Sequence, residues 1–467
     1  MLTGLVAMLA LYDRVALWAL LPVALLVTLG VTTSSFSEVL GGQWRIAAAV
    51  SVCVIASALW ITFLLSPVKR DLTPVPPFVN TTGTVVEDRL WGRQYAVAVT
   101  TPEGGFVMKL PFSPLTEGDR VRIEGSTKPF SYDAADSSFN EDRYWMARGM
   151  TAQLTPSKIE PDEGVSAWNI HRWRHVLHNS LSRRMPRLTG AYLSAVWTSK
   201  RDSWLDETHR SWGTSHILAV SGFHVGVAMA GASFILKRGK WRVPFLSLIL
   251  WFYIFLTGAP ASAVRAGLMI QAGLIGELVG RPGSSINSVS LAAVLLLLRS
   301  PFWFWDVGWR LSVLAALAIA VTIERGWPYD WKIWLFMNVM IWLATFPQVS
   351  WTFETTPLVG VILNLVAPQF FGVAFTTASV AAALSLLGFP ASSFLISVVE
   401  GTFTLWEVLA DAAARLIPWQ LGWSPVAAYC CAALFIMFTC RALFVPWRNV
   451  AVLSPFGALS AYALFAI

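Results

Sequence analysis

The stretch TSHILAVSGFHVGVAMAGASF, residues 214–234, combines the apolarity of a membrane helix with residues that such a helix rarely contains. It carries two histidines, His216 and His224, with the pair Ser221-Gly222 between them. A regular helix would separate the two imidazoles by about 12 Å along its axis, because each residue rises about 1.5 Å. They could share a metal ion only if the helix breaks at Ser221-Gly222. The stretch therefore predicts an interrupted membrane helix or a polar site within the bilayer.

Three roles are open for this stretch when it is taken by itself. The histidines and Ser221 can satisfy backbone groups that a discontinuous helix leaves free. They can line or gate a pathway through the membrane. Ser221 and His224 are three residues apart, hence neighbours on one helix face, and can also act as nucleophile and base of a hydrolase. Against the hydrolase, no base-orienting acid and no oxyanion donor is evident near them in the sequence.

The composition is that of a protein that crosses the bilayer many times. Of the 467 residues, 55% are hydrophobic and 13% are charged, whereas soluble domains carry about 25% charged residues. The mean hydropathy is +0.59, and the 24 tryptophans favour membrane–water interfaces. The net charge of +7 fits loops that orient a membrane protein and leaves a polyanionic partner open. We expect a polytopic α-helical membrane protein with about nine to twelve membrane segments, some broken or re-entrant.

Apolar runs divide the chain into four regions. We expect N-terminal transmembrane segments in 1–66, a polar domain in 67–165, an amphipathic interfacial helix with its connector in 166–210, and a polytopic transmembrane domain in 211–467. Several runs of the last region are shorter than the ~20 residues of a full crossing, which is why broken helices are expected. After the opening stretch these runs are 243–258, 262–280, 286–299, 304–323, 333–347, 356–387, 388–399, 403–418, 425–445 and 450–466.

Residues 67–165 consist of short alternating segments separated by turn residues. Basic and acidic side chains are nearly balanced in them, so they show no strong polyanion-binding signature. The basic loop KRGKWR, residues 237–242, predicts a cytoplasmic loop, and one crossing back places the polar domain outside. The alternation predicts a small all-β, OB-like exterior domain with strands at 82–88, 93–101, 104–111, 118–126 and 149–157.

The segment WNIHRWRHVLHNSLSRRMPRL, residues 168–188, places three histidines at i, i+4 and i+7. His171, His175 and His178 thus share one helix face, where three imidazoles can bind a metal ion. Five arginines and two tryptophans occupy the same segment, and clustered cations disfavour a divalent metal. We therefore favour an interfacial helix lying on lipid headgroups, and we expect neither metal nor cofactor.

Five segments, in order along the chain, resemble motifs of the ComEC family of DNA-uptake channel proteins. GTSHILAVSGFHVGV (213–227) is similar to G-x-x-H-[LI]-L-A-[IV]-S-G-[LF]-H, and LTGAPASAVRAGLM (256–269) to L-T-G-x-x-x-S-x-x-R-A. The resemblance covers nearly the whole chain. The other matching segments are SFNEDRYWMARGMTAQL, GRPGSSINSVSLAAVLLLLRSPFWFWDVGWRLSVLAALAI and LATFPQVSWTFETTPLVGVILNLVAPQ.

The resemblance implies a multi-pass plasma-membrane channel that passes one DNA strand into the cytoplasm during natural transformation. Its implied partners are single-stranded DNA, the lipid bilayer, an exterior DNA receptor and cytoplasmic single-strand-binding or ATP-driven proteins, with homo-oligomers left open. We assign pathway or structural roles, and no catalytic role, to the residues at matching motif positions and to the intramembrane Arg310. These are His216, Ser221, Gly222, His224, Arg265, Gly308, Arg310, Ser312, Pro347, Gly360 and Asn364.

The chain departs from the family pattern in ways that bear on activity. Many members end in a metallo-β-lactamase-like domain, but its H-x-H-x-D-H zinc motif is absent here and all six histidines precede residue 225. The exterior domain lacks a cysteine pair that some members have, and no G-x-x-x-x-G-K-[ST] nucleotide motif is present. We expect no enzymatic activity. The alternatives are a transporter of a small anion or lipid and, less favoured, the intramembrane serine hydrolase.

Overall fold

The computed structural model describes the predicted β region and most of the helices that follow it. The described residues are 75–442, except 114, 132–139, 163–167, 237–238, 240, 281–282, 325, 328–329 and 391, together with 450 and 454. The transmembrane segments predicted in 1–66, nearly all of the run 450–466 and most basic side chains of the 237–242 loop lie outside these residues.

Five strands close into a barrel in the order β1-β2-β3-β5-β4. The pair β3 and β5 is parallel, and the other four pairs are antiparallel. All five predicted strands are present close to their expected positions, and the closed five-stranded arrangement fits the predicted OB-like domain. Their bounds are β1 Phe78–Trp91, β2 Gln94–Thr101, β3 Gly104–Leu110, β4 Arg120–Pro129 and β5 Ala152–Pro161.

Strand β2 is buried on both faces, which explains how the barrel joins the helices. Val97 and Val99 point into the barrel core. The alternate residues Ala96 and Ala98 belong to a second core that continues through helix α6 (Glu141–Ala147) into the membrane helices. Small alanines on the outer face let the helices approach the strand closely, because successive strand residues point to opposite faces.

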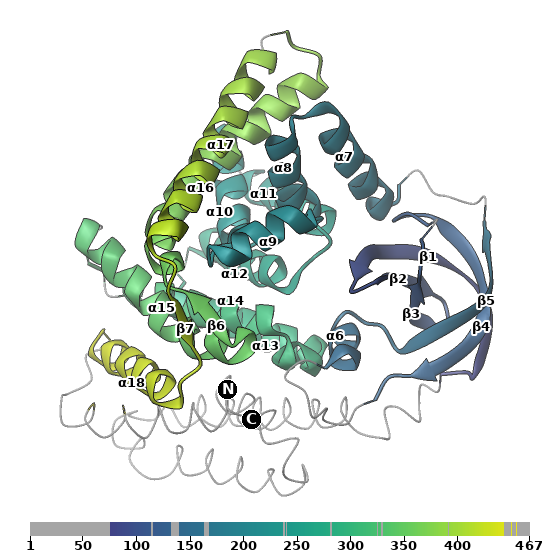
Figure 1. Cartoon of the computed structure of the whole chain (residues 1–467), viewed down its shortest axis with the longest axis horizontal. Coiled ribbons are helices and arrows are strands. Elements are labelled where there is room, and N and C mark those ends of the chain that lie inside the picture. The colour runs from purple at the N-terminus through teal and green to yellow at the C-terminus, as the bar shows by residue number, and fades with distance from the viewer. Residues whose placement is uncertain are drawn as a thin grey trace, which may run out of the picture.

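The helices that follow pack beside the barrel, with α7 and α6 reaching it at two separate places (Figure 1). Seven described helical segments are long and apolar enough to cross a membrane, and two shorter apolar helices accompany them. The chain is therefore a polytopic helical membrane protein with an inserted β domain. The helices are α7 Ile170–Arg184, α8 Arg187–Thr198, α9 Ser203–Ser211, η1 Ser215–Ile217, α10 Gly222–Ile235, α11 Arg242–Leu256, α12 Ala261–Val279, α13 Ser285–Arg299, η2 Pro301–Trp305, α14 Val307–Glu324, α15 Trp331–Phe353, α16 Val359–Leu386, α17 Ser392–Leu416 and α18 Pro425–Ala442.

One prediction about the membrane segments is wrong. The sequence predicts separate segments at 388–399 and 403–418, but a single helix, α17, runs through both. The polar residue between the two runs, Glu400, has partners across the bundle. Its carboxylate accepts hydrogen bonds from the backbone N–H groups of Leu188 and Thr189 at 3.0 and 2.8 Å. Glu400 therefore satisfies free donors at the N-terminus of α8 and does not interrupt its own helix.

Arg174 on α7 ties the barrel to the helices. Its side chain is 6% exposed, and its Nε donates to the Glu117 carboxylate of the β3–β4 loop at 2.8 Å. Its Nη2 donates to the Val86 carbonyl of β1 at 2.6 Å. On the bundle side, the guanidinium occupies the space that a Cβ on Gly258 would fill, in the turn between α11 and α12. One buried cation thus connects three parts of the fold.

The three histidines of α7 lie around this junction. No group of three metal-ligating side chains suited to an ion occurs among the described residues. Burial lowers the pKa of His171, His175 and His178 below the ordinary 6.5, and the nearby cations Arg174 and Lys200 add to the effect. The histidines are therefore neutral near pH 7, in a junction that already holds buried cations.

Gly258→Ala should destabilise the protein more than Gly280→Ala. Both glycines have positive φ, 83° and 66°, so each alanine meets the same kind of backbone strain. Only at Gly258 would the new Cβ overlap the guanidinium of Arg174, since a Cβ on Gly280 would have no other atom within 4 Å. We expect about 1–3 kcal/mol of additional destabilisation, measured by thermal unfolding in detergent. Equal losses in the two variants would show that Arg174 is not confined by Gly258.

The α7 histidines should make stability depend on pH. Because their pKa values are lowered in the folded protein, the stability linked to their neutral forms is fully present above 6.5 and is lost as the pH falls through the lowered values. We expect the Tm of His178→Gln to fall less than that of the wild type between about pH 7 and pH 5. Parallel Tm curves for the two proteins would contradict this role.

Candidate functional site

The predicted break at Ser221-Gly222 is confirmed. The short η1 ends at Ile217, and α10 begins at Gly222. Between them the chain becomes extended, with φ −120° and ψ 171° at Ser221. The carbonyl of Val220, freed by the break, accepts a hydrogen bond from the Ser262 hydroxyl of α12 at 2.5 Å. The interruption is thus held open by a side chain from a neighbouring helix, as irregular backbone at membrane depth requires.

His224 caps the helix that begins at the break. Its Nδ1 lies 3.2 Å from both the backbone N and the Oγ of Ser221. A residue at this third helical position commonly reaches back to the N-cap in this way, a role that Glu or Gln usually fills. The ring is 5% exposed, and its Nε2 has no hydrogen-bond partner within the described part of the chain. A catalytic histidine needs one nitrogen for the serine and an acid on the other. Nδ1 reaches the Ser221 Oγ but also caps its backbone N–H, and within the described residues no acid binds Nε2.

Arg265 of α12 lies directly beside the break. Its Nε donates to the Ser312 hydroxyl of α14 at 2.9 Å, and its Nη1 lies 3.4 Å from the Met269 sulfur. A Cβ on Gly222 would lie 3.5 Å from Nη2, an ordinary van der Waals distance, so the start of α10 packs directly beside the guanidinium. Arg265 is 6% exposed, and within the described residues no carboxylate pairs with it. Five predicted site residues are thus brought together: Ser221, Gly222, His224, Arg265 and Ser312.

Gly360 and Asn364 of α16 contact the turn at Gly213, which immediately precedes residues 214–234. Gly213 in that turn has φ 71°, which favours glycine. A Cβ on Gly360 would lie 3.1 Å from the Gly213 Cα, so the two backbones touch. The Asn364 amide donates to the Gly213 carbonyl at 3.4 Å. These two predicted residues therefore position residues 213–224 and stand apart from Arg265.

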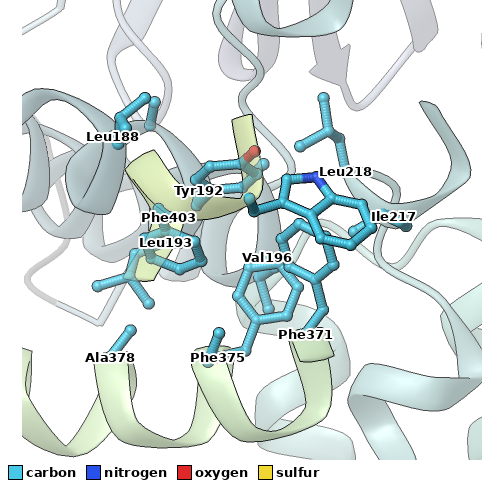
Figure 2. Packing of buried hydrophobic residues seen from close by; sticks show 14 of the residues in the cluster. Leu188, Tyr192, Leu193, Val196, Ile217, Leu218, Phe371, Phe375, Ala378 and Phe403 are labelled. Carbon is cyan, nitrogen blue, oxygen red and sulfur yellow. The ribbon is translucent and has the colours of Figure 1, made fainter. Parts of the chain in front are cut away.

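Sequence reasoning missed the buried network behind this turn. The Tyr192 hydroxyl lies 2.7 Å from Nε2 of His209, whose Nδ1 lies 2.9 Å from the Thr214 hydroxyl. Burial lowers the pKa of His209 to about 4, so it is a neutral structural link. Tyr192 stacks on Phe403 and packs with Phe371 and the other aromatic side chains shown in Figure 2. No local pattern signals this network, because its members come from α8, α9, α16 and α17.

His216 differs from the other two histidines near the break. It is exposed, whereas His209 and His224 are buried. It nevertheless lies within electrostatic range of both. Of the two predicted histidines in this stretch, His216 has the larger exposed surface.

The remaining predicted residues lie along α14 and α15. The Nε of Arg310 donates to the Phe304 carbonyl at 2.6 Å, and its Nη1 to the Gln348 side chain at 3.4 Å. Pro347 precedes that glutamine inside α15, which continues to Phe353. Gly308 is exposed at the start of α14, next to the Asp306 carboxylate that accepts from the Trp309 N–H at 2.9 Å. These residues brace η2, α14 and α15.

His224→Gln should be tolerated better than His224→Leu. A glutamine carbonyl can accept the Ser221 N–H as the imidazole does, whereas leucine leaves that donor without its cap. We expect the leucine variant to lose about 1 kcal/mol more stability, measured as a lower Tm in detergent. If glutamine is as damaging as leucine, the imidazole has a role other than capping.

A family model matches the part of the chain that contains the break. The family model described as Competence protein matches residues 198–466, more than half of the chain, including all the residues assembled around the break except Tyr192. No solved structure matches the chain significantly.

Three curated relatives are similar over part of their length. ComE operon protein 3 of Bacillus subtilis is 29% identical over 58% of this chain and 41% of its own length. Recombination protein 2 of Haemophilus influenzae is 25% identical over 62% of this chain and 38% of its own. An uncharacterized protein of Aquifex aeolicus is 24% identical over 55% of this chain and 60% of its own. The match spans less than two thirds of the length of each of these relatives. Because the Competence protein model matches more than half of the chain, the chain belongs to the competence protein family.

Proposed function

We propose that this chain forms the membrane route through which single-stranded DNA enters the cytoplasm. The observation that carries the proposal is Arg265: a buried guanidinium at a helix break with no carboxylate pairing with it among the described residues. An uncompensated charge at membrane depth costs several kcal/mol, so its retention calls for a function. A passing phosphate would provide the missing counter-charge.

The surroundings of Arg265 suit a transient anion. Ser312 holds Nε, so the direction of the guanidinium is set without neutralising it. Gly222 lies beside Nη2, and the break ends in the partly exposed Ser221. Each nucleotide brings one negative charge, and a route through lipid must replace its lost hydration with cations and polar groups. His216, which lies within electrostatic range of His224, adds a second imidazole to this stretch.

The family description and the name Recombination protein 2 support a role with DNA. We propose the plasma membrane as the location and the exterior as the side of the barrel. In this scheme an exterior receptor delivers DNA, and cytoplasmic single-strand-binding or ATP-driven proteins draw the strand inward. Homo-oligomers of the chain are compatible with it.

A transporter of a small anion is the second candidate, because Arg265 would serve it equally well. The two candidate functions differ in the size of the ligand. Purified protein would bind an oligonucleotide if it forms a DNA route, and only the small anion if it is an anion transporter. The serine hydrolase is less well supported, since Nδ1 of His224 already receives the Ser221 backbone N–H. Failure of a serine-reactive probe to label Ser221 would remove it.

Arg265→Met should strongly reduce DNA uptake while leaving the protein folded. Methionine has a similar length, and removing a buried charge without a partner carboxylate should leave Tm unchanged or raise it. We expect uptake of labelled DNA by whole cells to fall at least about tenfold at equal membrane levels, which corresponds to about 1.4 kcal/mol. Arg265→Lys should retain part of the activity.

Arg122→Gln is the matched control, since Arg122 is exposed on β4 far along the sequence from the break. It should take up DNA normally. Undiminished uptake by Arg265→Met would remove this residue from the route. A large fall in its Tm would instead show that Arg265 has a structural role.

A further inference from the structure

Helix α7, which the sequence predicts to be interfacial, presents an exposed basic face. Residues 168–188 contain five arginines and no Asp or Glu. Arg174 is buried in the junction, but Arg172, Arg183 and Arg184 are exposed. The exposed apolar residues Trp168 and Val176 lie among them. Within the described part of the chain no carboxylate forms an ion pair with Arg183 or Arg184.

Contacts on the other faces of α7 locate it at the edge of the bilayer. Trp173 packs against Phe252 of α11, with ring centroids 6.2 Å apart. Phe252 belongs to an exposed apolar face of α11 that suits lipid chains. This face consists of Phe245, Leu248, Ile249, Phe252 and Phe255. Arg174, by contrast, contacts the polar barrel. Helix α7 therefore lies between an apolar, lipid-facing surface and a domain in water, at the level of headgroups.

We propose that the exposed face of α7 binds the phosphates of anionic phospholipid headgroups. One guanidinium group can donate to two phosphate oxygens at once. The exposed Trp168 is a residue type that favours the interface between headgroups and water. The opposite face of the same helix holds Glu117 through Arg174. A lipid-bound α7 thereby fixes the height of the barrel above the membrane surface.

Arg183 and Arg184 are the residues to test. Arg187 is less suitable, because its guanidinium lies 4.1 Å from the Trp204 ring centroid and so contributes to packing. Arg172 is also less suitable, because its backbone lies against Gly118 of the barrel. Arg183 and Arg184 are exposed in the last turn of α7, so replacing them should leave the fold intact.

The experiment titrates the full-length protein in neutral detergent with dioctanoyl phosphatidylglycerol and, separately, dioctanoyl phosphatidylcholine, counting bound lipid by native mass spectrometry. Wild type should bind phosphatidylglycerol in preference to phosphatidylcholine. The double variant Arg183→Gln/Arg184→Gln should bind it about 20- to 30-fold more weakly, since each surface arginine contributes about fivefold. Arg122→Gln/Lys128→Gln, which removes two exposed cations from β4, should bind as wild type does.

Two arms test other sources of phosphate. Inorganic phosphate at equal concentration should not displace the lipid, and a thymidine oligonucleotide should not displace it from wild type. The proposal is overturned if the α7 double variant binds phosphatidylglycerol as tightly as wild type while its Tm is unchanged. It is also overturned if both lipids bind equally, or if phosphate or the oligonucleotide displaces the lipid. These experiments measure lipid binding and Tm and do not measure DNA uptake. Their outcome is therefore independent of the proposed function.

Discussion

The buried ion pair between Arg174 and Glu117 is the contact on which the relation of barrel and bundle depends. Two charges removed from water are costly unless each has its partner, so the pair forms only when α7, the β3–β4 loop and the α11–α12 turn meet. The pair specifies one docked arrangement. The shared apolar core through Ala96, Ala98 and α6 then adds burial to that arrangement.

The same requirement, that buried polar groups find partners, continues from the junction to the site. Next to Gly258, the Thr257 carbonyl accepts the Ser199 hydroxyl at 2.6 Å. Four residues after Gly258, Ser262 satisfies the Val220 carbonyl at the break. The barrel contact and the broken helix are therefore the two ends of one short segment, 257–262. Arg265, one turn further on, is the exception because it has a hydroxyl for a partner and no paired carboxylate among the described residues.

Much of the fold could be predicted from local pattern. Alternation and turn residues located all five strands, and Ser221-Gly222 located the break. The prediction failed at Glu400, which lies between the runs 388–399 and 403–418 that the sequence predicts as separate segments. A carboxylate ends a helix in lipid only if it lacks partners, and the N-terminus of α8 supplies them. The link through His209 was invisible for a similar reason, since Tyr192 and Thr214 become its neighbours only in the folded chain.

The sequence by itself determined the membrane class, the inserted barrel and the position of the interrupted helix, because each depends on composition or on residues close together in the chain. Only the tertiary structure decided which polar groups are satisfied. His224 caps its own helix, Gly360 and Asn364 hold the Gly213 turn, and Arg265 is left without a paired carboxylate in the described chain. Partners for buried charges come from distant helices, and a linear pattern does not contain those distances.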